Sequence, residues 1–274
     1  MIDTELDHAE DAARPARDYR ALRVSFEGPA QVIALHNPAR KNAIGPTMVN
    51  ELLWALDDAC ADERVRAIVL TGSGDAFCAG GDFAQMTGGG DGPELPPRGD
   101  YADLLLAMTR SPKPIVARVN GHAMGGGLGL VAASQFAVCV EGAKLGTPEI
   151  NVGLFPMMIM AVLARLVPKR ALLELMLFGE RIDAERARQL GLVGSVVAAE
   201  ALDAAVGAIV EKVGQKSPIT VKLGLEAYAA QADLALEEAL PMLRERLGAC
   251  LATDDAREGL MAFLQKRPPV WTGK

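Results

Sequence analysis

Apolar runs alternate with amphipathic stretches along the chain and predict a mixed α/β protein. Two strand-like runs in "RALRVSFEGPAQVIALHNP" are joined by Gly28 and Pro29, which predicts a hairpin. Apolar residues then recur at helical spacing in "TMVNELLWALDDACADE". Continuous apolar runs typical of buried strands follow in "VRAIVLTG", "PKPIVARVNG" and "QFAVCVEG". This strand–helix–strand order predicts parallel pairing with helices on the faces of the sheet.

The pattern changes after Phe155, where only helices are expected as far as Lys266. We therefore predict a disordered, charged tail over residues 1–18, a core over 19–200 and a helical region over 201–274. The tail has no apolar segment of the kind that a signal peptide needs. The stretch "MTGGGDGPELPPRGD", residues 86–100, is expected to be a surface loop. A mobile lid beside a ligand site is the alternative.

Composition and charge narrow the classes of function. Half of the 274 residues are hydrophobic, and the net charge is −7 with a pI of about 5.1. This balance argues against nucleic acid as a partner, which a basic face would bind. No stretch is long and apolar enough to predict a transmembrane helix, so no membrane partner is expected. The four cysteines have neither CxxC nor metal-ligand spacing, which predicts free thiols, no metal and a cytoplasmic location.

Two glycine-rich turns are the candidates for chemistry. "VNGHAMGGGLGLVAAS" places five glycines between Gly121 and Gly129, where a strand passes into a helix. It fits neither the dinucleotide nor the P-loop spacing, and there is no nucleophile elbow. Such a turn exposes backbone N–H groups that can bind an oxygen which becomes anionic. Close packing of helix on strand is the alternative explanation.

A second turn repeats the arrangement in "VLTGSGDAFCAGGDF". One amide from each turn can then meet a single carbonyl oxygen. That would form an oxyanion hole without a nucleophile.

Five segments, in order from Tyr19 to Trp271, resemble motifs of the crotonase superfamily, also called the enoyl-CoA hydratase/isomerase family. They are "HNPARKNAI", "GDAFCAGGD", "VNGHAMGGGLGL", "GTPEINVGLFP" and "EGLMAFLQKRPPVW". The resemblance implies an α/β fold, a crotonase-like ββα spiral core with a C-terminal helical trimerisation region. It also implies acyl-CoA substrates, with coenzyme A as part of the substrate and no separate cofactor. A homotrimer or a dimer of trimers is expected.

The resemblance also implies the roles of individual residues. The oxyanion N–H groups fall on Gly81 and Gly126, and the catalytic carboxylate falls on Glu149. We expect burial among apolar neighbours to raise the Glu149 pKa and suit it to proton transfer. These neighbours are Ile150, Val152, Leu154 and Phe155. Contacts with the CoA thioester are expected from Lys41, Ala43, Ala79, Gly80, Asp82, Gly125, Phe263 and Lys266, the last two reaching a neighbouring subunit's ligand.

Position 129 is the main departure from the family pattern. Hydratases of the family commonly have a first glutamate there, and this chain has Gly129. We expect the space above Gly129 to hold water or a bulkier acyl group. Asp82 is either a substitute acid or the cap of a following helix. Met157, Met158 and Met160 are expected to line an acyl pocket or to pack in the core.

One carboxylate supports more than one reaction. Hydration of a 2-enoyl-CoA, branched substrates included, is favoured. The alternative is isomerisation of a 3-enoyl-CoA to a 2-enoyl-CoA with Glu149 alone. A non-catalytic crotonase-fold protein that binds acyl-CoA is the alternative from another class.

Overall fold

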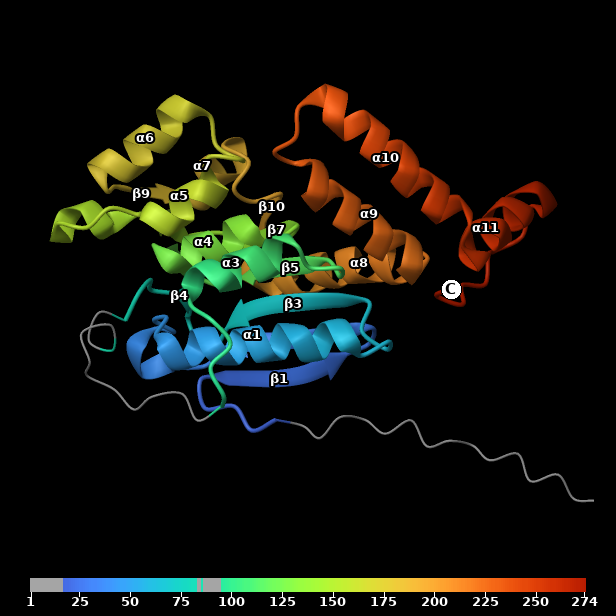
Figure 1. Ribbon diagram of the computed structural model, residues 1–274. Helices are drawn as coiled ribbons and strands as arrows, with labels where there is room; N and C mark the ends of the chain where they lie inside the picture. Colours follow the sequence, from blue (N-terminus) through green and yellow to red (C-terminus); the bar gives the residue numbers. More distant parts are fainter. Residues whose placement is uncertain (1–16, 83–84, 86–94) are drawn as a thin grey trace, which may run out of the picture.

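Two β-sheets organise the protein, as a computed structural model that describes residues 17–82, 85 and 95–274 shows (Figure 1). Within these residues the larger sheet has six strands, in the order β1 (Leu22–Glu27), β2 (Ala30–Leu35), β3 (Ala67–Gly72), β5 (Ile115–Val119), β7 (Phe136–Val140) and β10 (Ser195–Val197). The smaller sheet has four strands, in the order β4 (Ala76–Cys78), β6 (His122–Met124), β8 (Lys144–Gly146) and β9 (Arg181–Asp183).

The pairing confirms the predicted hairpin and the predicted parallel core. β1 and β2 are antiparallel, with Leu22 opposite Leu35, and β2, β3, β5 and β7 pair in parallel. The expectation that only helices follow Phe155 is wrong, because β9 and β10 lie there and form the edges of the two sheets. Each has only three residues, and none of the six is fully buried. A strand this short shows no apolar alternation for sequence reasoning to find.

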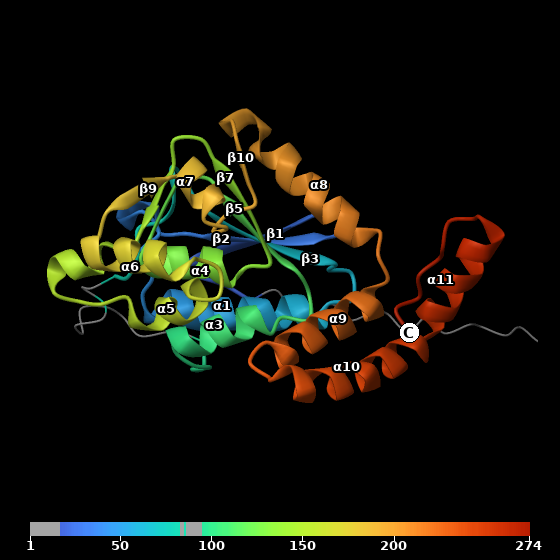
Figure 2. The same ribbon diagram turned by 90° about the horizontal axis from the view of Figure 1, so that it is seen from above.

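Helices cover both faces of the larger sheet (Figure 2). The described helices are α1 (Pro46–Ala61), α3 (Tyr101–Thr109), α4 (Gly126–Ala133), α5 (Met157–Leu163), α6 (Lys169–Phe178), α7 (Ala184–Gln189), α8 (Leu202–Gly214), α9 (Pro218–Gln231), α10 (Leu236–Leu251) and α11 (Asp254–Gln265). Short 3₁₀ helices are η1 (Pro38–Arg40), η2 (Pro148–Val152) and η3 (Ala199–Ala201). Within the described part, no helix combines the length and the apolar character needed to cross a bilayer.

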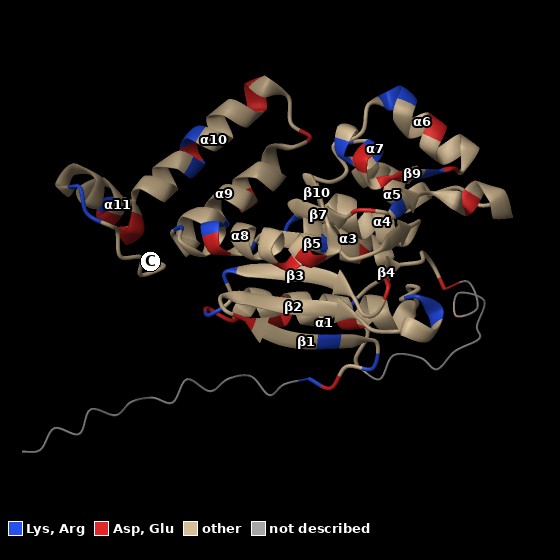
Figure 3. Ribbon diagram, turned by 180° about the vertical axis from the view of Figure 1, so that it is seen from behind, with Lys and Arg blue, Asp and Glu red and all other residues tan. Residues whose placement is uncertain are grey.

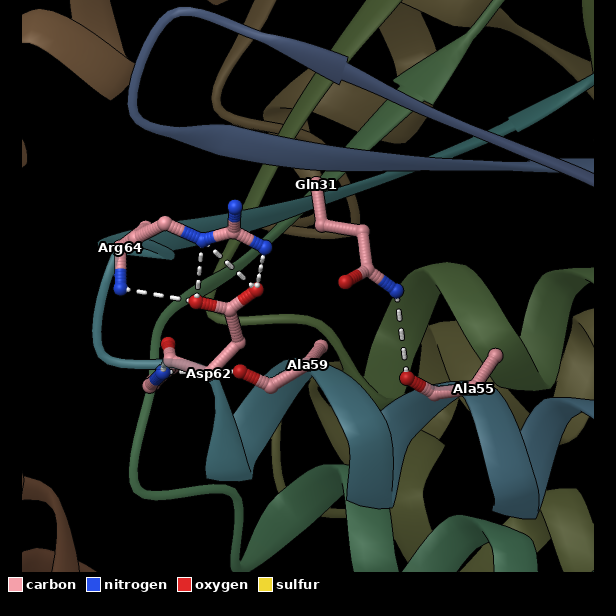
Figure 4. Close-up of polar contacts among 6 residues, drawn as sticks. Gln31, Ala55, Ala59, Asp62 and Arg64 are labelled. Atoms are coloured by element: carbon pink, nitrogen blue, oxygen red, sulfur yellow. Dashed lines mark hydrogen bonds and ion pairs between the residues drawn. The ribbon is translucent and has the colours of Figure 1, made fainter. Parts of the chain in front are cut away.

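The alternation of side chains in β2 explains how α1 and α8 come to lie on opposite faces. The side chain of Gln31 is buried against α1, where its amide donates to the Ala55 carbonyl at 3.3 Å (Figure 4). The next residue, Val32, lines a space beside Val206 of α8. Successive side chains of a strand point to opposite faces. α1 ends beside Asp62, whose carboxylate is paired with Arg64 (Figure 4).

The first described residues pack against α1, and the last helices extend away from the sheets (Figure 1). Residues 1–16 of the predicted tail lie outside the described residues, as do residues 86–94 of the predicted loop. Arg17, within the predicted disordered tail, is ordered against α1. It forms an ion pair with Asp58 at 2.7 Å, and its guanidinium lies 3.9 Å from the centre of the Trp54 ring. Beyond β10 the chain is helical, and α10 and α11 extend away from the sheets (Figure 1). Acidic and basic residues are interspersed over these helices (Figure 3). The division into three regions remains a prediction.

Candidate active site

Parallel pairing of β4 with β6 brings the two glycine-rich turns together. Ala76 lies opposite His122, and Cys78 lies opposite Ala123. Because parallel strands end at the same edge of a sheet, the turns that follow them are neighbours. Gly80 and Gly81 follow β4, and Gly125 and Gly126 follow β6.

Close packing explains some of these glycines. A Cβ atom on Gly127 would lie 2.5 Å from Cβ of Cys78, and one on Gly80 would lie 3.3 Å from the Met124 carbonyl oxygen. Gly80 and Gly125 also have φ values of +103° and +49°, which side chains rarely adopt. The packing explanation therefore applies to Gly80, Gly125 and Gly127.

The amides of Gly81 and Gly126 remain available for binding. Ile44 donates to the Gly80 carbonyl at 2.7 Å and accepts from the Asp82 amide at 2.8 Å. The Gly81 N–H between them is therefore turned away from Ile44. Gly126 is the first residue of α4, where N–H groups have no partner inside the helix. Among the described residues, neither amide donates a hydrogen bond.

Both glycines line a cavity of about 580 Å³. Its walls come from α1, α3, α4, η2, α5 and the segments beside them, and they are mostly apolar. Met157, Met158 and Ile159 line the cavity, whereas Met160 does not. Met160 is exposed and so does not pack in the core either, and both alternatives expected for it are wrong.

Glu149 of η2 also lines this cavity. A Cβ on Gly125 would lie 2.5 Å from the carboxylate Oε1, so the side chain rests directly against that glycine. The other oxygen, Oε2, is buried and has no hydrogen-bond partner among the described residues. Burial raises the pKa of Glu149 above its ordinary value. Val152 is 65% exposed and does not enclose the carboxylate, contrary to expectation, because it lies on the outward side of η2.

The space above Gly129 is filled, contrary to the expectation of water or a bulky acyl group. A Cβ on Gly129 would lie 2.4 Å from both Tyr101 Oη and Ile159 Cγ2. Tyr101 Oη donates to the Gly126 carbonyl at 2.5 Å. Sequence reasoning missed Tyr101 and the helix α3 that it begins, although Asp100 at the end of the glycine- and proline-rich loop is a helix-capping signal that could have indicated them.

The remaining CoA-binding candidates lie on two separate parts of the molecule. Ala79 and Lys41 are exposed on neighbouring turns. The Ala79 amide donates a hydrogen bond of 2.9 Å to the Lys41 carbonyl, which joins the two turns. Ala43, on the same turn as Lys41, is half-buried. Phe263 on α11 is 81% exposed, and Lys266 is the residue that caps the end of this helix. In both views α11 lies far from α5 and α6 (Figures 1 and 2).

Asp82 is turned away from the cavity and toward Arg40. Its buried carboxylate forms an ion pair with Arg40 at 2.7 Å. It also accepts a hydrogen bond of 3.3 Å from the Gln85 amide, as a helix cap does. Asn42 is a residue that sequence reasoning missed. It is fully buried, and its amide donates to the carbonyls of Ser73 and Ala76 at 2.9 Å. Asn42 thereby ties the turn of Lys41 to the chain that leads into β4.

Comparison with known proteins gives a consistent result over nearly the whole chain. The family model described as enoyl-CoA hydratase/isomerase matches residues 26–274. A Thermus thermophilus relative, named only provisionally as an enoyl-CoA hydratase, is 36% identical over 250 residues, which cover 89% of this chain and 97% of the relative. The enoyl-CoA hydratase domain-containing protein 3 of Xenopus laevis, named as mitochondrial, is 34% identical over 88% of this chain and 82% of its own length.

Among solved structures, an enoyl-CoA hydratase of Mycobacterium smegmatis superposes with a TM-score of 0.84 at 34% identity, covering 92% of this chain and 99% of that one. The α/β spiral expected from the motifs is thus the fold of the protein. The chain belongs to the enoyl-CoA hydratase/isomerase family, the crotonase superfamily.

Proposed function

We propose that this protein hydrates a 2-enoyl-CoA thioester, with Gly81 and Gly126 as oxyanion donors and Glu149 as the acid/base. The observation that carries the proposal is that three polar groups, unpaired among the described residues, belong to residues around the same cavity. Two amides and a buried carboxylate oxygen, none with a partner in the described structure, belong to residues around one apolar cavity. An unpaired buried carboxylate oxygen is costly, which favours a ligand that completes it.

The chemistry follows from this arrangement. The two N–H groups hold the thioester oxygen and stabilise the negative charge that develops on it. Glu149 takes a proton from a water molecule as the water oxygen bonds to C3, and the electron pair of the C2–C3 bond moves onto the thioester. Glu149 then returns the proton to C2, giving a 3-hydroxyacyl-CoA. Burial raises the pKa of Glu149, which makes the carboxylate a better proton acceptor than an ordinary one, as suits a group that must both accept and release a proton.

A specific observation keeps isomerisation as the second candidate. Besides Glu149, the acid on the described cavity wall is Asp100, and its carboxylate accepts the amides of Ala102 and Asp103 at 2.8 and 3.2 Å. Glu149 therefore acts alone, as it would in moving a proton between C2 and C4 of a 3-enoyl-CoA. The apolar wall with Met157 and Met158 accommodates a branched acyl group in either reaction.

We also propose that the active form is a homotrimer or a dimer of trimers in the cytoplasm. Phe263 and Leu264 of α11 are 81% and 73% exposed, which favours burial against another subunit. In that assembly Phe263 and Lys266 would reach a neighbouring subunit's CoA. The free thiols of all four cysteines favour a reducing compartment.

Absorbance of the conjugated thioester distinguishes the candidates. Loss of the signal from a 2-enoyl-CoA means hydration, and its appearance from a 3-enoyl-CoA means isomerisation. A panel of linear and branched substrates assigns the acyl group. No change with any substrate, despite binding of the thioester, would contradict the proposal and favour a binding protein.

Glu149→Gln is the matched variant for this assay. We expect it to bind butyryl-CoA like the wild type and to lose roughly 10²–10⁴-fold in kcat, because general acid/base groups contribute about that much. A variant within threefold of the wild-type kcat would remove Glu149 from the mechanism.

A further inference from the structure

The Tyr101 hydroxyl occupies the space that a side chain at position 129 would need. Its Oη lies 2.4 Å from the position of a Cβ on Gly129 and donates to the Gly126 carbonyl at 2.5 Å. The ring also lies against Gly126, whose Cβ position is 3.5 Å from Cζ of the tyrosine. A side chain from α3 thus contacts the first turn of α4 at the residue proposed as an oxyanion donor.

The backbone that Tyr101 contacts carries no side chains, although the Gly125 amide and carbonyl are themselves hydrogen-bonded to Gly146 and Gly129. Gly125, Gly126 and Gly127 are consecutive, and without Cβ atoms their backbone angles are weakly restricted. An oxyanion donor contributes to catalysis only if its direction is set before the reaction. The hydrogen bond from Tyr101 holds the Gly126 carbonyl, which belongs to the Gly126–Gly127 peptide, and only the Cα of Gly126 separates this peptide from the one that carries the Gly126 N–H.

We propose that Tyr101 is a positioning residue: by holding the carbonyl of Gly126 it restricts rotation about the Gly126 Cα and thereby keeps the Gly126 N–H directed at the substrate oxygen. The inference rests on the proposed function, because it requires a thioester oxygen at Gly126. Tyr101 fills the space beside position 129, where hydratases of the family commonly carry a first glutamate, but its task is different. It aims a donor and supplies no second acid.

Anchors on α1 hold Tyr101 in place. Asn50 is buried, accepts the Arg98 amide at 2.7 Å and donates to the Leu95 carbonyl at 3.0 Å. The Trp54 indole donates to the Pro96 carbonyl at 2.9 Å. Asp100 then caps α3 in a reciprocal arrangement with Asp103. Residues 95–100 are therefore tied to α1, which contradicts a mobile lid for this part of the predicted loop.

The protonation state supports the same role. Burial raises the pKa of Tyr101 well above its ordinary value, and Cys78 and Glu149 nearby raise it further. The hydroxyl therefore keeps its proton and remains a donor to Gly126 throughout the range in which Glu149 exchanges protons.

Tyr101→Phe tests the proposal because it removes only the hydroxyl. With crotonyl-CoA we expect kcat to fall about fivefold to tenfold and KM to change by less than about twofold, the effect of losing one hydrogen bond in the transition state. The infrared carbonyl stretch of bound butyryl-CoA should shift less than in the wild type. Tyr228→Phe, on the exposed surface of α9, is the matched control and should change neither quantity.

The outcomes separate the inference from the function it rests on. A carbonyl shift in wild type and an equal shift in Tyr101→Phe would overturn the positioning role while leaving the oxyanion assignment in place. No carbonyl shift in wild type would overturn both. A lower thermal stability of Tyr101→Phe with unchanged kcat and carbonyl shift would make the hydrogen bond merely structural and would likewise overturn the proposal.

Discussion

Burial of the Glu149 carboxyl makes the folded state less stable once this group is ionised. Burial raises its pKa above the ordinary 4.5 while Oε2 has no partner in the described structure. Between pH 4.5 and the raised pKa, the folded protein holds a proton that the unfolded chain has released. The stability that this group contributes is therefore fully present below pH 4.5 and is lost as the pH rises through the raised pKa.

Glu149→Gln should accordingly unfold at a higher temperature than the wild type at pH 8, with a smaller difference at pH 4. The expected gain in unfolding free energy at pH 8 is about 1 kcal/mol, the scale of one unsatisfied polar group. Thermal unfolding followed by circular dichroism measures it. Glu174→Gln, at an exposed position of α6, is the matched control, and an equal response in both variants would contradict the prediction.

Gly129 is a position where even one methyl group should be excluded. Gly129→Ala would place Cβ 2.4 Å from Tyr101 Oη and Ile159 Cγ2, so we expect a loss of about 1–3 kcal/mol from overpacking. Gly224→Ala in α9, which meets nothing within 4 Å, should instead stabilise by up to about 1 kcal/mol through helix propensity. Urea denaturation of the two variants compares them. Similar stability changes would mean that the packing at Gly129 is looser than the structure indicates.

At the scale of elements, Asp255 fastens the chain end to α11 and α9. Its buried carboxylate accepts the Ser217 hydroxyl and the Thr272 amide, each at 2.7 Å, and the Gly273 amide at 3.1 Å. Burial alone would raise the Asp255 pKa, but these hydrogen bonds together hold it below its ordinary 3.8. The carboxylate therefore stabilises the fold above pH 3.8, and that contribution is lost as the pH falls through the lowered pKa.

Asp255→Asn should lower the unfolding free energy at pH 7 by about 2 kcal/mol, the scale of hydrogen bonds to a charged group. The gap to wild type should narrow as the pH falls below 3.8 and close below the lowered pKa of the folded protein, where the native carboxylate also becomes neutral. Asp254→Asn is the control, because its carboxylate is exposed and pairs with Arg257 at the surface. Denaturant melts at pH 7 and pH 3 measure both. A gap for Asp255→Asn that stays constant with pH would refute the account.

At the scale of the whole molecule, the helices beyond the sheets present an apolar surface without a partner. Leu247 and Leu251 of α10 and Leu260, Phe263 and Leu264 of α11 are each more than half exposed. Surfaces of this kind mark protein interfaces. Light scattering at micromolar concentration should therefore give the mass of a trimer or of two trimers. Phe263→Asp should lower that mass, and a monomeric wild type would contradict the expectation.

The local pattern of the chain was enough to determine the hairpin, α1, the buried parallel strands and the family itself. Each depends on a periodicity or motif within one stretch of sequence, such as the apolar run of β3 or the glycines beside Gly126. Burial of such runs is favourable wherever the chain folds, so their structure is readable locally.

Tertiary structure alone decided which of these parts meet. The edge strands β9 and β10 owe their structure to the neighbours they pair with, because three residues carry too little pattern. The open space expected above Gly129 is closed by Tyr101 and Ile159, residues distant in the chain that only packing brings together. The glycine at position 129 showed from the sequence that an acid is missing there. That Tyr101 fills the space instead depends on how α3 packs against α4, which no local pattern reveals.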